Sequence, residues 1–129
     1  MALYISLVEH PARLTLSETA MLLQWQPSYS AALSLQSGLA VNAGLLGLIA
    51  WYQDQNWLWL AGAVVILMNW PFTLAIMWRT NKRLMAMEPD QANSNSRKLL
   101  VHWGRLHAVR SGLGCVATAL YAFSILAGR

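Results

Sequence analysis

The sequence is poor in charge, because only 11% of its 129 residues are Asp, Glu, Lys or Arg. About a quarter is usual in a soluble domain, so an ordinary water-exposed globular protein is excluded. The shortage is concentrated in three stretches, 30–52, 55–78 and 111–128, which contain no charged residue. Each is close to the roughly 20 residues that a helix needs to cross the bilayer core. We therefore predict an integral membrane protein.

Cysteine is almost absent, and strand-like patterns are missing. Cys115 is the only cysteine, which excludes an intrachain disulfide and a cysteine-based metal cluster. It lies in the last apolar stretch, where we expect it to pack as a small hydrophobe. The alternating segments of about ten residues that build a membrane barrel do not occur. The predicted fold class is all-α, with residues 1–129 forming a single membrane domain.

Complete membrane helices are expected at 30–52, 57–78 and about 96–127, joined by short connections that favour an antiparallel bundle. A separate interfacial helix over 15–25 should end near Pro27. The helix that contains Pro71 should kink, because proline offers no N–H to the carbonyl one turn earlier.

Small residues recur at four-residue intervals in two of these helices, which allows a second helix to approach closely. These stripes suit either contacts within the bundle or an oligomer, and they comprise Ala40, Ala43, Gly44 and Gly47, then Gly104, Ala108 and Gly112.

The first eight residues are apolar but too short to span a bilayer. They change abruptly into Glu9, His10, Pro11, Ala12 and Arg13, as at the cytoplasmic end of a transmembrane helix. We expect about a dozen further apolar residues to precede Met1 in the natural protein. With this truncated first helix, the predicted fold is an antiparallel four-helix bundle.

The net charge is +4 and the pI about 9.7. The cations cluster between the second and third charge-free stretches, whereas the turn at 54–56 has none. This asymmetry follows the positive-inside rule, so we expect a multi-pass protein of a bacterial-type inner membrane, with the lipid bilayer rather than nucleic acid as its partner. The clustered cations are Arg79, Lys82, Arg83, Arg97, Lys98 and Arg105.

The expected topology gathers chemically useful side chains at the cytoplasmic end. Trp103, His107 and Arg110 share one helix face. One interpretation makes His107 a general base and Arg110 the stabiliser of an enolate-like oxygen, which needs no cofactor. The second choice is a transition metal, because two histidines and a carboxylate suit iron, zinc or copper. Its candidate ligands are Glu9, His10 and His107.

Each of these residues also has a purely structural interpretation. Glu9 can neutralise Arg13 or Arg110, and Arg110 can extend to lipid phosphates. Asn69 can bind a carbonyl freed by Pro71, and Trp103 can lie in the interfacial aromatic belt. Gln36 and Asn42 suit hydrogen bonds between helices.

Several motifs in order along the chain resemble a family of small membrane proteins whose few characterised members are anthrone oxygenases of polyketide biosynthesis. Two departures are the incomplete first helix and Arg79, where the family usually has proline before the Thr-Asn pair. The motif residues are Tyr4, Glu9, His10, Pro11, Ala12 and Arg13; Asn69, Pro71, Phe72 and Thr73; Thr80, Asn81 and Leu84; and Leu100, Trp103, His107 and Arg110.

The resemblance implies oxidation of an acidic CH₂ group of a lipophilic, polyketide-type aromatic substrate by dioxygen, with no obvious cofactor. On this hypothesis His107 is the base, Arg110 and Asn81 stabilise the enolate, and Glu9 orients His107. Trp103, Asn69 and His10 would bind the substrate. The alternative is a non-enzymatic scaffold, partner subunit or transporter component. The two differ in whether these side chains share one pocket.

Overall fold

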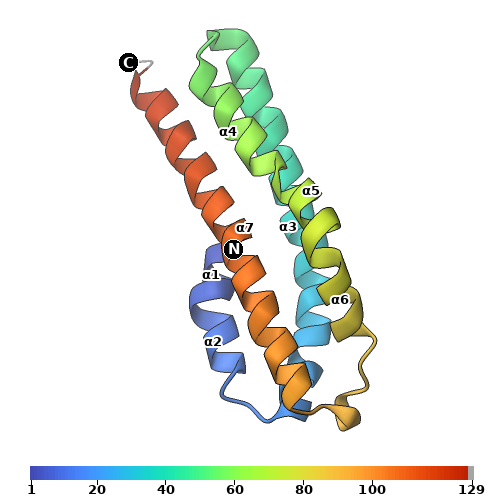
Figure 1. Cartoon of the computed structure of the whole chain (residues 1–129). Helices are drawn as coiled ribbons and strands as arrows, with labels where there is room; N and C mark the ends of the chain where they lie inside the picture. The colour runs from blue at the N-terminus through green and yellow to red at the C-terminus, as the bar shows by residue number, and fades with distance from the viewer. Residues whose placement is uncertain (128–129) are drawn as a thin grey trace.

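The computed structural model describes residues 1–127, and within that range it is helical with no strand. Three rods are each long and apolar enough to cross a membrane, and each runs antiparallel to the one before it along the chain (Figure 1). This confirms a multi-pass helical membrane protein. The rods are α3 (Glu18–Asp54), the series α4 (Trp57–Leu67), α5 (Asn69–Phe72), η2 (Thr73–Met77) and α6 (Trp78–Met85), and finally α7 (Ser94–Ala127).

A short fourth rod lies beside one half of α7 (Figure 1). It consists of α1 (Ala2–Tyr4), the π-helical η1 (Ile5–Glu9) and α2 (His10–Arg13). We call the half of the bundle that contains it the polar end, and the half near the turn at Gln55 the far end. The bundle therefore has four helical rods at the polar end and three at the far end.

The separate interfacial helix predicted for 15–25 is wrong, because α3 runs unbroken through Pro27. Ser17 begins this helix, and its Oγ accepts a hydrogen bond from the Ala20 amide at 3.3 Å. Proline at 27 removes one backbone hydrogen bond. Leu22 and Trp25, just before it, are completely buried. Both side chains belong to the main core, and this packing holds the helical path across that single missing bond.

The predicted disturbance near Pro71 is confirmed as an interruption of the middle rod. Helix α4 ends at Leu67, α5 begins at Asn69, and the π-helix η2 follows. The Asn69 side-chain amide donates to the Ile66 carbonyl at 3.0 Å, and the Thr73 hydroxyl donates to the Asn69 carbonyl at 2.7 Å. These side chains supply partners to the irregular backbone, as a break inside a bilayer requires. The short η3 (Pro89–Gln91) then connects the middle rod to α7.

The first stripe of small residues makes the close contacts that were predicted. A methyl group on Gly44 would collide with Leu67, and one on Gly47 with the Tyr121 side chain. Gly62 of α4 faces Tyr121 as well, so this ring lies between two glycines. Its hydroxyl donates to the Ala43 carbonyl at 2.9 Å. The absence of a side chain at Gly47 and Gly62 therefore leaves the space that the Tyr121 ring occupies at the far end.

The second stripe of small residues makes only part of the close contacts that were predicted. Gly104 lies directly against the His10 ring. A β-carbon at Gly112 would meet no other atom within 4 Å, and Ala108 is exposed. The close helix contact predicted for these two residues therefore does not exist within residues 1–127. Cys115 is exposed rather than packed.

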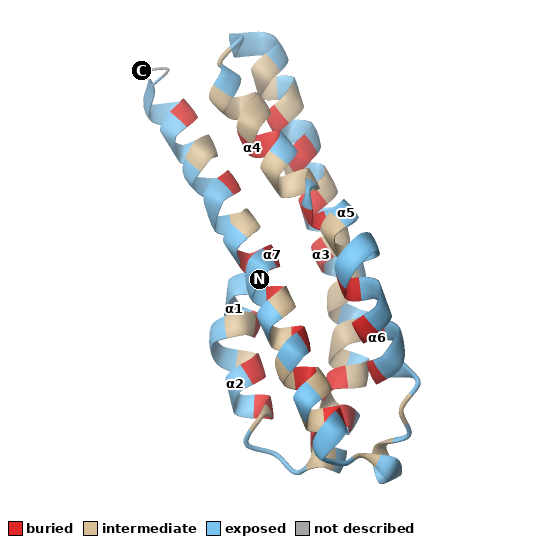
Figure 2. Ribbon diagram, in the orientation of Figure 1, coloured by how far each residue is buried: buried red, intermediate tan, exposed pale blue. Residues whose placement is uncertain are grey.

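Buried side chains occupy the faces that the rods turn toward one another, and the outward faces are largely apolar and exposed (Figure 2). In a membrane those outward leucines, valines and tryptophans contact lipid. The main core lies at the polar end, around Ile5, Met21, Leu22, Trp25, Met77, Leu84, Leu100 and Trp103.

Candidate functional site

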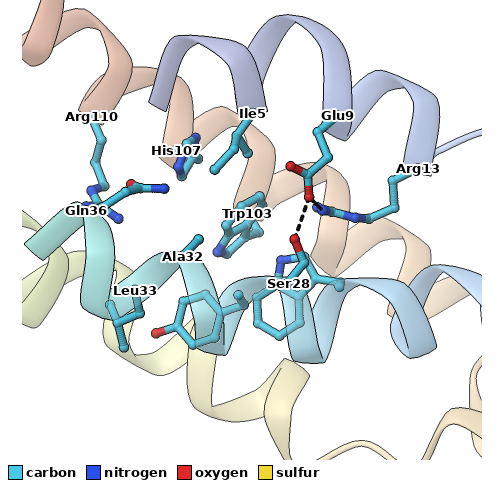
Figure 3. Close-up of a pocket in the computed structure, with 12 residues that line it drawn as sticks. Ile5, Glu9, Arg13, Ser28, Ala32, Leu33, Gln36, Trp103, His107 and Arg110 are labelled. Carbon is cyan, nitrogen blue, oxygen red and sulfur yellow. Dashed lines mark hydrogen bonds and ion pairs between the residues drawn. The ribbon is translucent and has the colours of Figure 1, made fainter. Parts of the chain in front are cut away.

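A narrow pocket opens between the short fourth rod, α3 and α7 (Figure 3). Its free volume is about 20 Å³, enough for a water molecule. Glu9 comes from η1, and His107 and Arg110 come from α7. The predicted gathering of these three at one end is therefore observed. The full lining is Ile5, Glu9, Arg13, Trp25, Ser28, Tyr29, Ala32, Leu33, Gln36, Trp103, His107 and Arg110.

His107 belongs to a ring of hydrogen bonds with two serines. The Ser6 hydroxyl lies 3.0 Å from His107 Nδ1 and 2.8 Å from the Ser111 hydroxyl, and Ser111 donates to the His107 carbonyl at 3.3 Å. With Ser111 donating to that carbonyl, its oxygen can accept from Ser6, and the Ser6 oxygen can accept from Nδ1–H. This arrangement favours the Nδ1–H tautomer of the imidazole. Nε2, which carries the lone pair in that tautomer, bonds to no residue that the structure describes.

Glu9 does not orient His107, contrary to the sequence-based expectation. Its Oε1 accepts from Arg13 at 2.5 Å, from Ser28 at 2.5 Å and from Gln24 at 3.3 Å. Arg13 also donates to Gln24 and is almost completely buried. The charge of Glu9 is therefore matched by Arg13, one of the structural alternatives, and the network fastens the fourth rod to α3. The residue that is hydrogen-bonded to the His107 ring is Ser6.

Trp103 is the platform on which His107 rests. The two rings stack with centroids 4.8 Å apart, and Trp25 meets Trp103 edge-on at 5.5 Å. The indole N–H donates to Asn81 Oδ1 at 2.9 Å. Asn81 does not line the pocket, and its oxygen is committed to Trp103. Its contact supports a role in fixing the platform rather than in stabilising an enolate.

His10 points toward α7, while Glu9, the preceding residue, points toward α3. The His10 ring packs on Gly104 and lies 5.4 Å from the Trp103 ring. His10 lines neither this pocket nor the two larger cavities beside Arg110, so contact between His10 and a substrate is not supported. Among the described residues, no three His, Cys, Asp or Glu side chains are placed to hold a metal ion. Glu9, His10 and His107 therefore do not fit the metal site considered from the sequence.

Arg110 is 8% exposed, and within residues 1–127 it makes no hydrogen bond or ion pair. Glu9 is taken by Arg13, and Glu18 pairs with Arg97 at 2.9 Å. Arg110 Nε is buried without an acceptor. An unpaired buried guanidinium is costly, so the arrangement calls for an anionic or carbonyl oxygen from a ligand.

Two further cavities meet at Arg110. One holds about 190 Å³ between α3 and the α5–η2 segment, and it includes Tyr29, Asn69 and Trp78 in its wall. The other is a broad apolar groove of about 710 Å³ between α3, α4 and α7. Asn69 lines both, and its Oδ1 is buried with no partner among the described residues. Arg110 and Asn69 are therefore brought together, as predicted, although Asn69 lies outside the narrow pocket.

The sequence-based interpretation missed Ser6, Gln24, Ser28 and Ser111. Ser111 lies four residues after His107, so helical spacing alone offered a signal. Gln24 and Ser28 also share a helix face, but this shows only once α3 is known to run through Pro27. Nothing in the local sequence marked Ser6.

A protein-family model described as anthrone oxygenase matches residues 25–120 of this chain. The matched range includes Asn69, Asn81, Trp103, His107 and Arg110, and it begins after Glu9 and Arg13. No curated protein and no solved structure matches the chain.

Proposed function

Because this chain belongs to the anthrone oxygenase family, we propose that it is a membrane enzyme that oxidises an acidic CH₂ group of a lipophilic aromatic compound with dioxygen. The observation that carries the proposal is the pairing of His107, whose Nε2 is left free by the Ser6–Ser111 ring, with Arg110, a buried cation without an acceptor. A base beside an oxyanion-binding cation is the equipment that enolate formation requires.

The reaction balances as R₂CH₂ + O₂ → R₂C=O + H₂O. His107 Nε2 takes one proton from the CH₂ carbon, and the electron pair moves onto the conjugated oxygen beside Arg110. That carbon then forms a bond to dioxygen, which is reduced to the peroxide level, and His107 returns its proton to the terminal oxygen. Loss of the second C–H proton with cleavage of the O–O bond releases water and leaves the ketone of a quinone. Carbon is oxidised by four electrons and dioxygen accepts all four.

The other groups position the base. Trp103 supports the imidazole ring and Asn81 fixes Trp103, while Ser6 and Ser111 hold the tautomer. The Glu9–Arg13 network closes the pocket by fastening the short rod to α3. The apolar cavities beside Arg110 suit a substrate that partitions into the bilayer. We place the site at the cytoplasmic side of a bacterial-type inner membrane from the distribution of cations.

Isotope labelling of the purified protein in lipid vesicles tests the proposal. With 2-hydroxyanthrone, which has a free hydroxyl group, and ¹⁸O₂, we expect one ¹⁸O atom in the quinone and one in water for each dioxygen consumed. His107→Ala protein in the same vesicles sets the rate of spontaneous oxidation. Equal rates for the two proteins would refute the proposal and favour a scaffold or partner subunit, in which the same side chains serve only to join helices.

A further inference from the structure

The cavity between α3 and the α5–η2 segment has an apolar body and a polar inner end. Its outer wall consists of Trp70, Leu74 and Trp78, which are 43%, 56% and 48% exposed on the surface that faces lipid. Its inner end carries Arg110 and Asn69, which are more than nine-tenths buried. The volume of about 190 Å³ slightly exceeds that of a cavity of roughly 150 Å³ known to take up benzene. One aromatic ring of a ligand therefore fits.

The two inner groups need opposite partners. Arg110 Nε is a donor that lacks an acceptor, and Asn69 Oδ1 is an acceptor that lacks a donor. The Asn69 amide cannot simply be reversed, because its Nδ2 donates to the Ile66 carbonyl. Seven buried side-chain atoms lack a partner among the described residues, and Arg110 Nε and Asn69 Oδ1 are the two that belong to residues lining this cavity. Because buried polar groups are usually partnered, a donor and an acceptor left open at one cavity end suit a ligand. That ligand offers both a hydroxyl donor and an oxygen acceptor.

We propose that Asn69 is a specificity-determining residue that accepts a hydrogen bond from a substrate hydroxyl group, while Arg110 binds a carbonyl or enolate oxygen of the same molecule. The substrate ring that carries the hydroxyl occupies the cavity and enters from the bilayer past Trp70 and Trp78. This inference rests on the proposed function for the reaction that follows binding. It adds that an aromatic compound lacking a free hydroxyl group binds poorly, however lipophilic it is.

A product-like pair of probes measures this preference without any chemistry. 2-Hydroxyanthraquinone and 2-methoxyanthraquinone both carry carbonyl acceptors, and only the first carries a donor. Quenching of tryptophan fluorescence in vesicles, with Trp70 and Trp78 beside the cavity, reports binding. We expect the wild-type protein to bind the hydroxy compound about tenfold more tightly, because the ether leaves the Asn69 oxygen unpaired. The Asn69→Leu variant should bind the two compounds equally.

Three further variants keep the test falsifiable if Asn69→Leu disturbs the helix interruption. Asn42→Leu removes an exposed asparagine of α3 that lines no cavity, and it should retain the tenfold preference. Ala40→Leu fills the buried wall of the cavity and should weaken binding of both probes, whereas Ala31→Leu, at an exposed position of the same helix, should not.

Equal binding of the two probes by the wild-type protein would overturn the inference, as would a preference that survives in Asn69→Leu. These outcomes are separable from the fate of the proposed function. If the preference depends on Asn69 but no dioxygen is consumed, the binding assignment stands and the oxidation fails. If dioxygen is consumed but the probes bind equally, the oxidation stands and the role of Asn69 fails.

Discussion

Different kinds of contact hold the helices together at the far end and at the polar end of this bundle. At the far end, Gly47 and Gly62 admit the ring of Tyr121, and one hydroxyl-to-carbonyl hydrogen bond completes the contact. At the polar end, Glu9, Arg13, Gln24 and Ser28 form a partly buried charged network, and nearby Arg110 and Asn69 keep unsatisfied atoms. In lipid, close packing is sufficient to hold helices together. Packing does not require the unsatisfied atoms of Arg110 and Asn69, and the proposed function rests on them.

Of the substitutions that compare the two ends, His107→Ala at the polar end should have the largest effect on activity. Loss of the general base is expected to lower kcat by about 10²- to 10⁴-fold. Quinone formation monitored by absorbance is the measurement, and the amount of protein in the membrane fraction should not change. His102→Ala, at an exposed position on the same helix, is the control and should keep full activity. Full activity in the His107 variant would remove the base from the mechanism.

Arg110→Gln should produce the next largest effect. Removing the cation that stabilises a developing oxyanion is expected to cost about 10²- to 10³-fold in kcat. Steady-state oxygen uptake measures it, with Arg105→Gln as an exposed control on α7. If Arg110 were only an anchor to the membrane, the variant would lose insertion rather than kcat, and the assignment would fail.

Ser6→Ala tests whether the hydrogen-bonded ring around His107 matters. Ser6 is a positioning residue, so we expect a loss of about tenfold in kcat with little change in KM, as one buried hydrogen bond would give. Nitrogen NMR of the imidazole should show the Nδ1–H form in the wild-type protein and a mixture of tautomers in the variant. Ser34→Ala, at an exposed position of α3, should change neither. An unchanged tautomer together with unchanged kcat would contradict the role of Ser6.

Tyr121→Phe should have the smallest effect, and it should act on stability alone. It removes the hydrogen bond to the Ala43 carbonyl while keeping the ring between the two glycines. Such bonds within membranes average about 0.6 kcal/mol, which is the expected loss in free energy of unfolding, with kcat unchanged. Titration with a denaturing detergent measures it, and Tyr52→Phe is an exposed control. A large loss of activity would mean that the two ends are not separate.

Charge-free lengths were enough to predict the three long rods, and the missing N–H of Pro71 predicted the break in the middle one. The alternating direction of the rods then predicted that Glu9, His107 and Arg110 converge at one end. Partners across the bundle were not predictable. The path of α3 through Pro27 depends on the burial of Leu22 and Trp25 in the main core, which the local sequence does not show. The partner of His107 depends on the rotation of a short rod about its own axis, and a single sequence does not encode that rotation locally.

The attachment of the short rod also sets an order of assembly during synthesis. Arg97 of α7 donates to the Leu14 and Leu16 carbonyls at 2.7 and 2.6 Å, and His107 and Ser111 hold Ser6. Residues 6–16 leave the ribosome before these α7 partners by about 80 to 105 residues of synthesis, several seconds at usual rates. The α3 partners of the short rod, Gln24 and Ser28, follow Glu9 within 19 residues. The contacts of the short rod with α3 can therefore form early, whereas those with α7 form only after that helix has been made.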